Sequence, residues 1–156
     1  MSGGEPVGSR QWPVAEDPAG SDELVYVVGS EFGIVAEGAI QSYRDLRVWQ
    51  EAMDLAEAVY SASKAFPSDE RFGLTSQIRR ASVSVPSNIA EGWGRGRTGE
   101  YVQFLRYARS SLREAETQWL LAQRLGFLAA ETTADLEVRA DRLGRGLLAL
   151  LRALGQ

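Results

Sequence analysis

A hydrophobic period of three to four residues starts near Ser42 and continues to the C-terminus, and it constrains the fold more than any other feature. Proline or glycine interrupts this period three times, which divides it into four segments. Each segment has the spacing of an amphipathic helix with one buried face. Because the connections are short, consecutive helices are expected to be antiparallel neighbours. The sequence therefore predicts an all-α fold over residues 42–156, an antiparallel up-down-up-down four-helix bundle.

Helix-terminal signals give the expected bounds. Ser42 and Asp45 form a capping-box pattern for the first helix, which should end at Phe66-Pro67 because the residue before a proline is pushed out of helical geometry. The other helices are expected to begin near Ser68, Thr98 and Thr132, with stops around Gly92-Trp93-Gly94 and at Gly126.

The same spacing predicts which side chains are buried. The expected stripes are Trp49, Met53, Ala56, Val59 or Tyr60, and Phe66; then Leu74, Ile78, Ala81, Val85 and Ile89; then Leu105, Ala108, Leu112, Ala115, Trp119, Ala122 and Leu125; and finally Leu136, Ala140, Leu143, Leu147, Leu150 and Leu154.

Residues 1–41 differ from the predicted bundle in composition. Residues 1–43 hold seven acidic side chains against Arg10, a net charge of −6, whereas residues 44–156 hold sixteen bases against fourteen acids, a net charge of +2. An acidic, mostly irregular N-terminal extension is expected. Two β-type runs within residues 24–36 favour a short β-hairpin, which would need support from the bundle or from a neighbouring subunit.

Composition excludes several classes of function. No apolar run is long enough for a membrane span, and the first twenty residues lack the apolar core of a secretory signal, so a soluble, cytoplasmic protein without membrane contact is expected. The chain has no cysteine and no histidine, which removes the thiolate nucleophile, the usual general base and the ligands of the usual di-metal bundle sites. We expect no cofactor, no metal and no enzymatic activity, because no convergent catalytic set is visible.

Arginines gather in the middle of the chain. Residues 71–113 contain eight arginines against Glu91 and Glu100, a local charge of +6, and a polyanion is a natural partner for such a segment. Arg106, Arg109 and Arg113 share one helix face; they form either a solubilising surface or a site for phosphate or an acidic partner. The expected nucleic-acid or partner contacts are Arg79, Arg80, Arg95, Arg97, Arg106, Arg109 and Arg113.

Two further features interrupt the second helix. Pro86 lies inside its stripe, where it removes a backbone hydrogen bond, so a local kink supported by the polar side chains of Ser82, Ser84, Ser87 and Asn88 is expected. The stretch Gly92 to Gly99 lacks the ending of a P-loop and indicates a hinge whose Arg95 and Arg97 are either phosphate contacts or solvated loop residues.

Four acidic residues lie near the basic middle of the chain: Glu91, Glu100, Glu114 and Glu116. We expect them to pair with Arg79, Arg80 or Arg113.

The segment GLTSQIRRASVSVPSNIAEGWGR, Gly73 to Arg95, closely resembles the signature of bacterial four-helix bundle proteins first noticed in intervening sequences of large-subunit ribosomal RNA genes. The resemblance covers about residues 43–153, and its most specific part is the structural motif around Pro86, Ser87, Asn88, Glu91 and Gly92. Relatives commonly begin near the position of Tyr43, so the acidic extension departs from the pattern.

The resemblance implies a non-enzymatic bundle that assembles as a ring-like homopentamer. It also implies a relation to the accessory variability determinant of diversity-generating retroelements, a basic pentamer that binds a reverse transcriptase and nucleic acid. Two hypotheses follow. The first is an oligomeric accessory protein for RNA or DNA, or for a reverse transcriptase. The second is a structural adaptor whose basic face docks an acidic protein partner or the extension.

Overall fold

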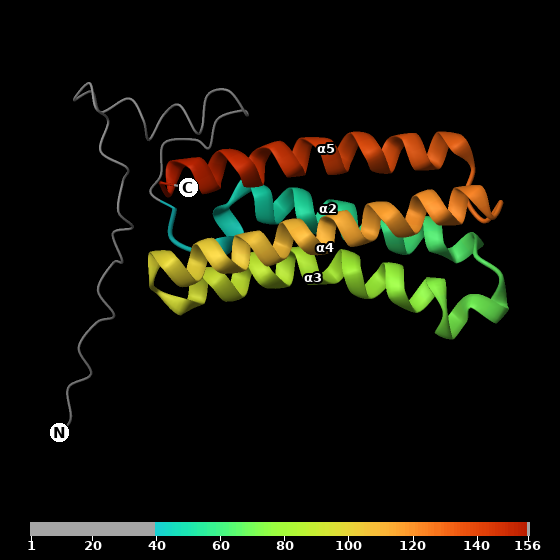
Figure 1. The fold of residues 1–156 in the computed structure, drawn as a ribbon, viewed down its shortest axis with the longest axis horizontal. Helices are drawn as coiled ribbons and strands as arrows, with labels where there is room; N and C mark the ends of the chain where they lie inside the picture. The colour runs from blue at the N-terminus through green and yellow to red at the C-terminus, as the bar shows by residue number, and fades with distance from the viewer. Residues whose placement is uncertain (1–39, 156) are drawn as a thin grey trace.

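The computed structural model describes residues 40–155 and contains four α-helices in that range, α2 Arg47–Ala62, α3 Leu74–Arg95, α4 Thr98–Arg124 and α5 Ala130–Ala153 (Figure 1). Consecutive helices run in opposite directions, which confirms the predicted all-α up-down-up-down bundle. The acidic extension and the expected hairpin over residues 24–36 lie outside the described residues.

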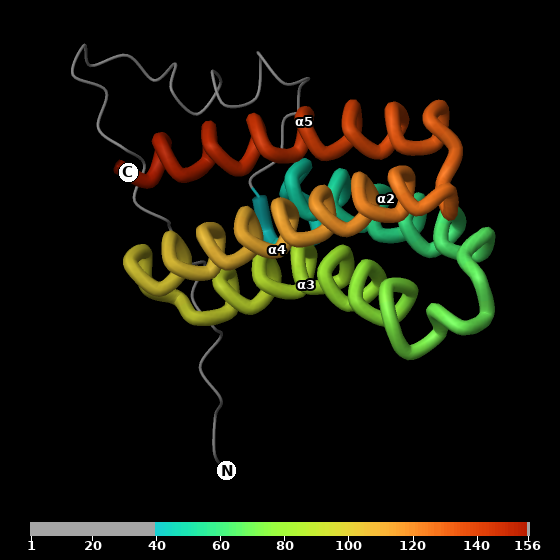
Figure 2. The backbone as a smooth tube through the Cα atoms, turned by 45° about the vertical axis from the view of Figure 1, so that its right-hand side comes forward, coloured from blue at the N-terminus to red at the C-terminus, as the bar shows by residue number. Residues whose placement is uncertain are grey.

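The helices form a closed square in cross-section. Each helix packs beside the next one along the chain and α5 packs beside α2, whereas the described backbones do not approach one another closely across either diagonal. The most extensive packing joins α3 and α4, which lie side by side in two different views (Figures 1 and 2). Trp119, Leu105, Leu112, Ile89 and Leu143 are among the fully buried side chains at the centre. The predicted stripe of α3 is buried at every position.

The capping box of Ser42 and Asp45 is present, but it closes a shorter helix than predicted. The Asp45 carboxylate accepts from the Ser42 backbone N–H at 2.8 Å, and the Ser42 hydroxyl accepts from the Arg44 N–H at 3.1 Å. These bonds cap a 3-10 turn, Tyr43–Asp45, and α2 starts only at Arg47. The segment after Pro67 is likewise a 3-10 helix, Ser68–Phe72, so α3 begins at Leu74 and not near Ser68.

The predicted buried stripe of the first helix is confirmed at Ala56, Val59 and Phe66, but it is wrong at Trp49 and Met53. The side chains that enter the core are Val48, Ala52, Leu55, Ala56 and Val59, whereas Met53 and Tyr60 are 37% and 44% exposed and Trp49 is half-buried. Successive residues of an α-helix are rotated by about 100°, so the two stripes lie side by side on the helix. Both stripes are apolar. α2 therefore has a second apolar stripe outside the core, which consists of Trp49, Met53 and Tyr60.

The two ends of α4 and of α5 differ from the prediction by only a few residues. Gly126 ends α4 as predicted: its φ is +78°, its N–H donates to the Gln123 carbonyl, and the Phe127 N–H donates to the Ala122 carbonyl. Leu125 is 52% exposed because it is already the C-cap, and Leu151 takes the fully buried place expected of Leu150. Thr98 and Thr132 lie inside their helices, whose N-caps are Arg97 and Ala129.

The connection between the two helices lies within Gly92 to Gly99 as expected, but it is shorter than predicted, and the predicted helix stop at Gly92-Trp93-Gly94 is wrong. α3 continues through Gly92 and Gly94 to Arg95, and Gly96 with φ +75° and Arg97 alone connect it to α4. The reason lies in packing, since a Cβ placed on Gly92 would lie 2.6 Å from the Phe104 Cβ of α4. Gly92 therefore permits the close approach of two helices and does not break one.

Candidate functional site

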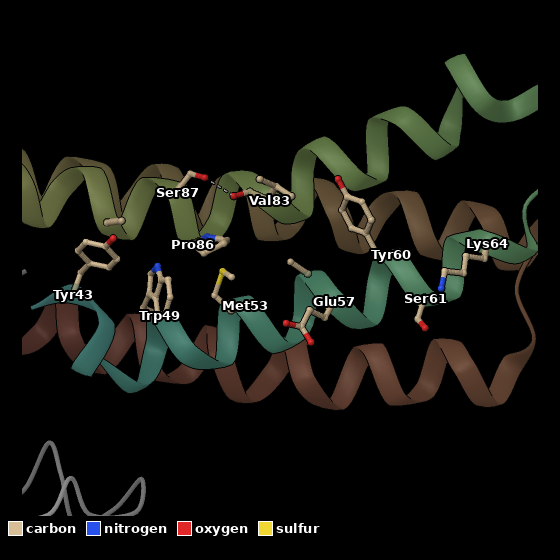
Figure 3. A pocket seen from close by; sticks show the side chains of 12 residues that line it. Tyr43, Trp49, Met53, Glu57, Tyr60, Ser61, Lys64, Val83, Pro86 and Ser87 are labelled. Carbon is tan, nitrogen blue, oxygen red and sulfur yellow. Dashed lines mark hydrogen bonds between the residues drawn. The ribbon is translucent and has the colours of Figure 1, made fainter.

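An apolar groove runs between α2 and α3 on the outside of the bundle (Figure 3). Its α2 side is the second apolar stripe with its flanking residues, and its α3 side carries Pro86, which is buried, and Val83, which is 41% exposed. Of the charged residues that line it, Glu57 lies near the middle of the groove and Lys64 at the end away from Tyr43 (Figure 3). The full lining is Tyr43, Trp49, Met53, Ala56, Glu57, Tyr60, Ser61, Lys64, Val83, Pro86, Ser87 and Ala90.

Pro86 lies within α3 among side chains that hydrogen-bond to the preceding turn. The Ser82, Ser84 and Ser87 hydroxyls donate to the carbonyls of Arg79, Arg80 and Val83, at 2.8 to 2.9 Å. The Asn88 amide donates to the Ser84 carbonyl at 2.8 Å. Such back-bonding tends to bend helices, and α3 turns away from α2 on the Val83 side of Pro86 (Figure 3). The bend helps to open the groove.

A second, polar groove adjoins the first and is called the arginine groove here. It is lined by Tyr60, Arg71, Phe72, Thr75, Ser76, Arg79, Arg80, Val83, Ser84 and Ser87. Tyr60, Val83 and Ser87 belong to both grooves, so the apolar and basic surfaces are continuous. Three guanidinium groups and several hydroxyl groups therefore gather along one side of α3.

The charge of the arginine groove is not neutralised by its own helix. No acidic residue occurs between Glu70 and Glu91, and neither Arg79 nor Arg80 has an ion pair with a described carboxylate. Arg79 is instead positioned by uncharged groups, because its Nε donates to the Ser63 Oγ at 2.8 Å and its guanidinium carbon lies 4.8 Å from the Tyr60 ring centroid. A fixed arginine without a carboxylate partner is well suited to bind an anion.

The arginines predicted on α4 lie on a different side of the bundle. Phe104 faces α3, since it meets Gly92 and its ring lies 5.0 Å from the Arg95 guanidinium carbon. By the rotation of about 100° per residue, Arg106, Arg109 and Arg113 project between about 140° and 180° away from Phe104. Arg113 is also paired with Glu116 at 2.5 Å. The predicted set of seven arginines thus does not form one surface.

The remaining predicted residues lie at the turn between α3 and α4. Arg95, in the last turn of α3, pairs with Glu91 at 2.5 Å, and Arg97 is exposed at the N-cap of α4. The expectation that the local acids pair with Arg79, Arg80 or Arg113 is confirmed for Glu116, whereas Glu91 pairs with Arg95. Glu114 accepts instead from the Gln118 amide at 3.2 Å.

Within residues 40–155, no three potential metal ligands gather at one place. None of the helices described is long and apolar enough to cross a membrane. Burial raises the pKa of the Tyr101 phenol above its ordinary value of 10.0. Tyr101 lies against Gly92 and Trp93, where its ring contributes to the packing of α3 on α4.

The family of 23S rRNA-intervening sequence proteins matches residues 44–149. The chain belongs to this family. The match spans all of α2, α3 and α4 and most of α5, so the bundle is the part held in common with the 23S rRNA-intervening sequence proteins. A search among curated proteins gives no match to the chain.

Sequence reasoning placed Arg79 and Arg80 in the candidate site but missed Arg71 and Phe72 beside them. Phe72 is 87% exposed, the most exposed of the large apolar side chains in residues 40–155. A signal was present, because Phe72 does not fit the stripe of Leu74, Ile78 and Ala81 and directly follows an arginine. An aromatic residue outside the buried period and beside a base is a candidate contact residue.

Proposed function

We propose that this 23S rRNA-intervening sequence protein is a non-enzymatic accessory protein that assembles with copies of itself and binds nucleic acid through the arginine groove. The observation that carries the proposal is the stretch of α3 with Arg79 and Arg80 and no acidic residue between Glu70 and Glu91. Arginine forks bind phosphate oxygens in a two-pronged geometry, and groups that already hold a carboxylate are poorer at this.

Self-assembly is supported by the second apolar stripe of α2. Monomeric proteins rarely leave a continuous apolar surface of this kind open, and Met53, Tyr60 and Val83 are each more than a third exposed. We infer that a second copy covers the apolar groove, and the resemblance to ring-forming relatives makes five copies the expected number. Because the arginine groove adjoins the apolar groove, assembly would bring the arginine grooves of several copies onto one particle.

The arrangement also supports a finer proposal, which is that nucleic acid and a reverse transcriptase are held together by such a particle. Repetition of a weak basic site around a ring increases avidity without any new contact, since the second binding event becomes intramolecular. This part of the proposal depends on the resemblance to the accessory protein of diversity-generating retroelements. Copurification with a reverse transcriptase encoded beside the gene would test it.

The nucleic-acid proposal is tested by fluorescence anisotropy with labelled 12-nucleotide RNA and DNA over a series of salt concentrations. The double variant R79Q/R80Q should weaken binding about tenfold or more and reduce the slope of log K against log salt by about 1 to 2, because phosphate contacts release counterions. The matched control is R139Q/R145Q on α5, where both arginines are paired with Asp135 and Asp141. Absence of salt-dependent binding by the unmutated protein would refute the proposal.

The assembly proposal is tested by sedimentation analysis, which should give a multiple of the 17.1 kDa chain mass. Val83→Asp should lower that mass toward one chain, because it places a charged, hydrated side chain in the apolar groove that the second copy would have to cover. Val138→Asp is the control, since Val138 on α5 is 70% exposed and lies outside both grooves. An unchanged mass in Val83→Asp would remove the apolar groove from the interface.

An adaptor that binds an acidic protein has one observation in its favour, the net charge of −6 in residues 1–43 of the same chain. If these residues compete for the arginine groove, a chain that lacks residues 1–41 should bind the labelled strands more tightly. Equal binding by the two chains would count against this second candidate.

A further inference from the structure

We propose that the arginine groove selects single-stranded nucleic acid, with Phe72 as a platform on which one unpaired base stacks. This inference rests on the proposed function and adds the class of nucleic acid. It starts from Phe72, an aromatic ring that is 87% exposed on the outside of the bundle. Leaving such a ring in water forgoes the free energy that its burial would contribute, so a ligand that covers it is favoured.

The surroundings of Phe72 match the two chemical parts of a nucleotide. The guanidinium carbon of Arg71 lies 5.3 Å from the Phe72 ring centroid, and Arg79 and Arg80 follow about two turns later along the same groove. Proteins that bind single strands combine aromatic side chains, which stack on bases, with basic side chains, which follow the backbone phosphates. An exposed ring between cations has this composition.

The local backbone explains why Phe72 is presented to solvent. Phe72 is the last residue of the 3-10 helix Ser68–Phe72, and Gly73 with ψ −122° separates it from α3. The Leu74 N–H at the start of α3 is satisfied by the Glu70 carboxylate at 2.8 Å. A Cβ on Gly73 would lie 2.5 Å from that carboxylate, so the turn requires glycine or a displaced Glu70. The break in the helix keeps Phe72 out of the stripe that begins at Leu74.

A duplex would use this surface poorly. Its bases are already stacked on one another, so their faces are not available to Phe72, and only the contacts between arginine and phosphate would remain. Tyr60 is less available than Phe72, because its side chain is 44% exposed against 87% and its position is shared with the apolar groove. The preference for an unpaired strand should therefore depend mainly on one side chain.

The test uses the full-length protein and three labelled 12-nucleotide probes: a single strand, its duplex, and a strand of the same length without bases. Phe72→Ala should weaken binding of the single strand by roughly five- to a hundredfold, the range for loss of one stacked base, and leave the abasic strand unchanged. Phe72→Trp should retain the affinity, whereas Phe72→Leu, which is apolar without an aromatic face, should not. RNA and DNA versions of the single strand show which sugar is preferred.

The other outcomes separate this inference from the proposed function. If R79Q/R80Q weakens binding while Phe72→Ala does not, the stacking platform is refuted and nucleic-acid binding stands. If Phe72→Ala weakens the abasic and base-bearing strands equally, the ring does not stack on a base and the inference fails. If Phe72→Ala changes the sedimentation mass, Phe72 belongs to a contact between subunits and the inference also fails. If no probe binds even at low salt, both proposals fail.

Discussion

The two sides of α3 differ in how completely they are covered. On one side α3 packs against α4 so closely that Gly92 has no room for a methyl group beside Phe104. On the other side α3 and α2 leave two continuous grooves, lined by Val83, Pro86 and the unpaired arginines. One helix thus holds the bundle together on one side and lines both grooves on the other. Polar and small residues of the signature segment serve both tasks.

Gly92→Ala should produce the largest change in stability, because it alters the side of α3 that packs against α4. The new Cβ would lie 2.6 Å from the Phe104 Cβ and 3.0 Å from a Tyr101 ring carbon, so the two helices must separate. We expect the free energy of unfolding to fall by about 1 to 3 kcal/mol, the usual cost of overpacking, as measured by urea denaturation.

Gly94→Ala is the matched control, with the same substitution two residues later in the same helix. A Cβ at Gly94 meets no atom within 4 Å, and alanine is a better helix former than glycine by about 1 kcal/mol. This variant should therefore be as stable as the unmutated protein or more so. Equal destabilisation by both variants would show that the helix backbone, and not its distance from α4, is what these positions require.

Tyr101 on the packed side should make the protein sensitive to alkali. Its folded-state pKa is raised by burial, so above pH 10 the unfolded chain loses a proton that the folded chain keeps, and stability falls as pH rises. From this group alone we expect a loss of about 1 kcal/mol between pH 10 and pH 11.

Denaturation curves at a series of pH values measure this loss, and the Tyr101→Phe variant is the control because it keeps the ring without the titrating group. The difference in stability between the two proteins should be constant below pH 9 and should change in favour of phenylalanine above pH 10. A difference that stays constant throughout would mean that water reaches the phenol.

The sequence predicted the packed side of α3 well and the open side poorly, for a physical reason. The hydrophobic period of α3 defines one buried stripe. The five positions of this stripe are all buried, namely Leu74, Ile78, Ala81, Val85 and Ile89. α2 has two apolar stripes, and the hydrophobic period alone does not say which one faces the core. The structure buries Val48, Ala52 and Val59 and leaves the larger Met53 and Tyr60 at the groove.

The candidate site was predicted only in part, for a related reason. Arg79 and Arg80 were identified from local charge, which is visible in sequence. The separation of Arg106, Arg109 and Arg113 from them depends on the rotation of α4 against α3, which is set by the contact of Gly92 with Phe104. Phe72 was missed because its exposure follows from a turn that the Glu70 carboxylate and Gly73 make together.

Glu91→Gln should have the smallest effect on stability and on binding. It tests whether an arginine that loses its carboxylate partner binds a strand more strongly. Glu91 and Arg95 are 53% and 47% exposed, and loss of such a surface pair should change the free energy of unfolding by no more than about 0.5 kcal/mol. The substitution leaves Arg95 without its carboxylate and removes one negative charge from α3. We expect binding of a single strand to become about twofold tighter at low salt. This gain should be lost at high salt, because salt screens the attraction between arginine and phosphate. Asp135→Gln on α5, which separates Arg139 from its partner, should change binding less. If both substitutions tighten binding equally, net charge and not the position of the arginine governs the interaction.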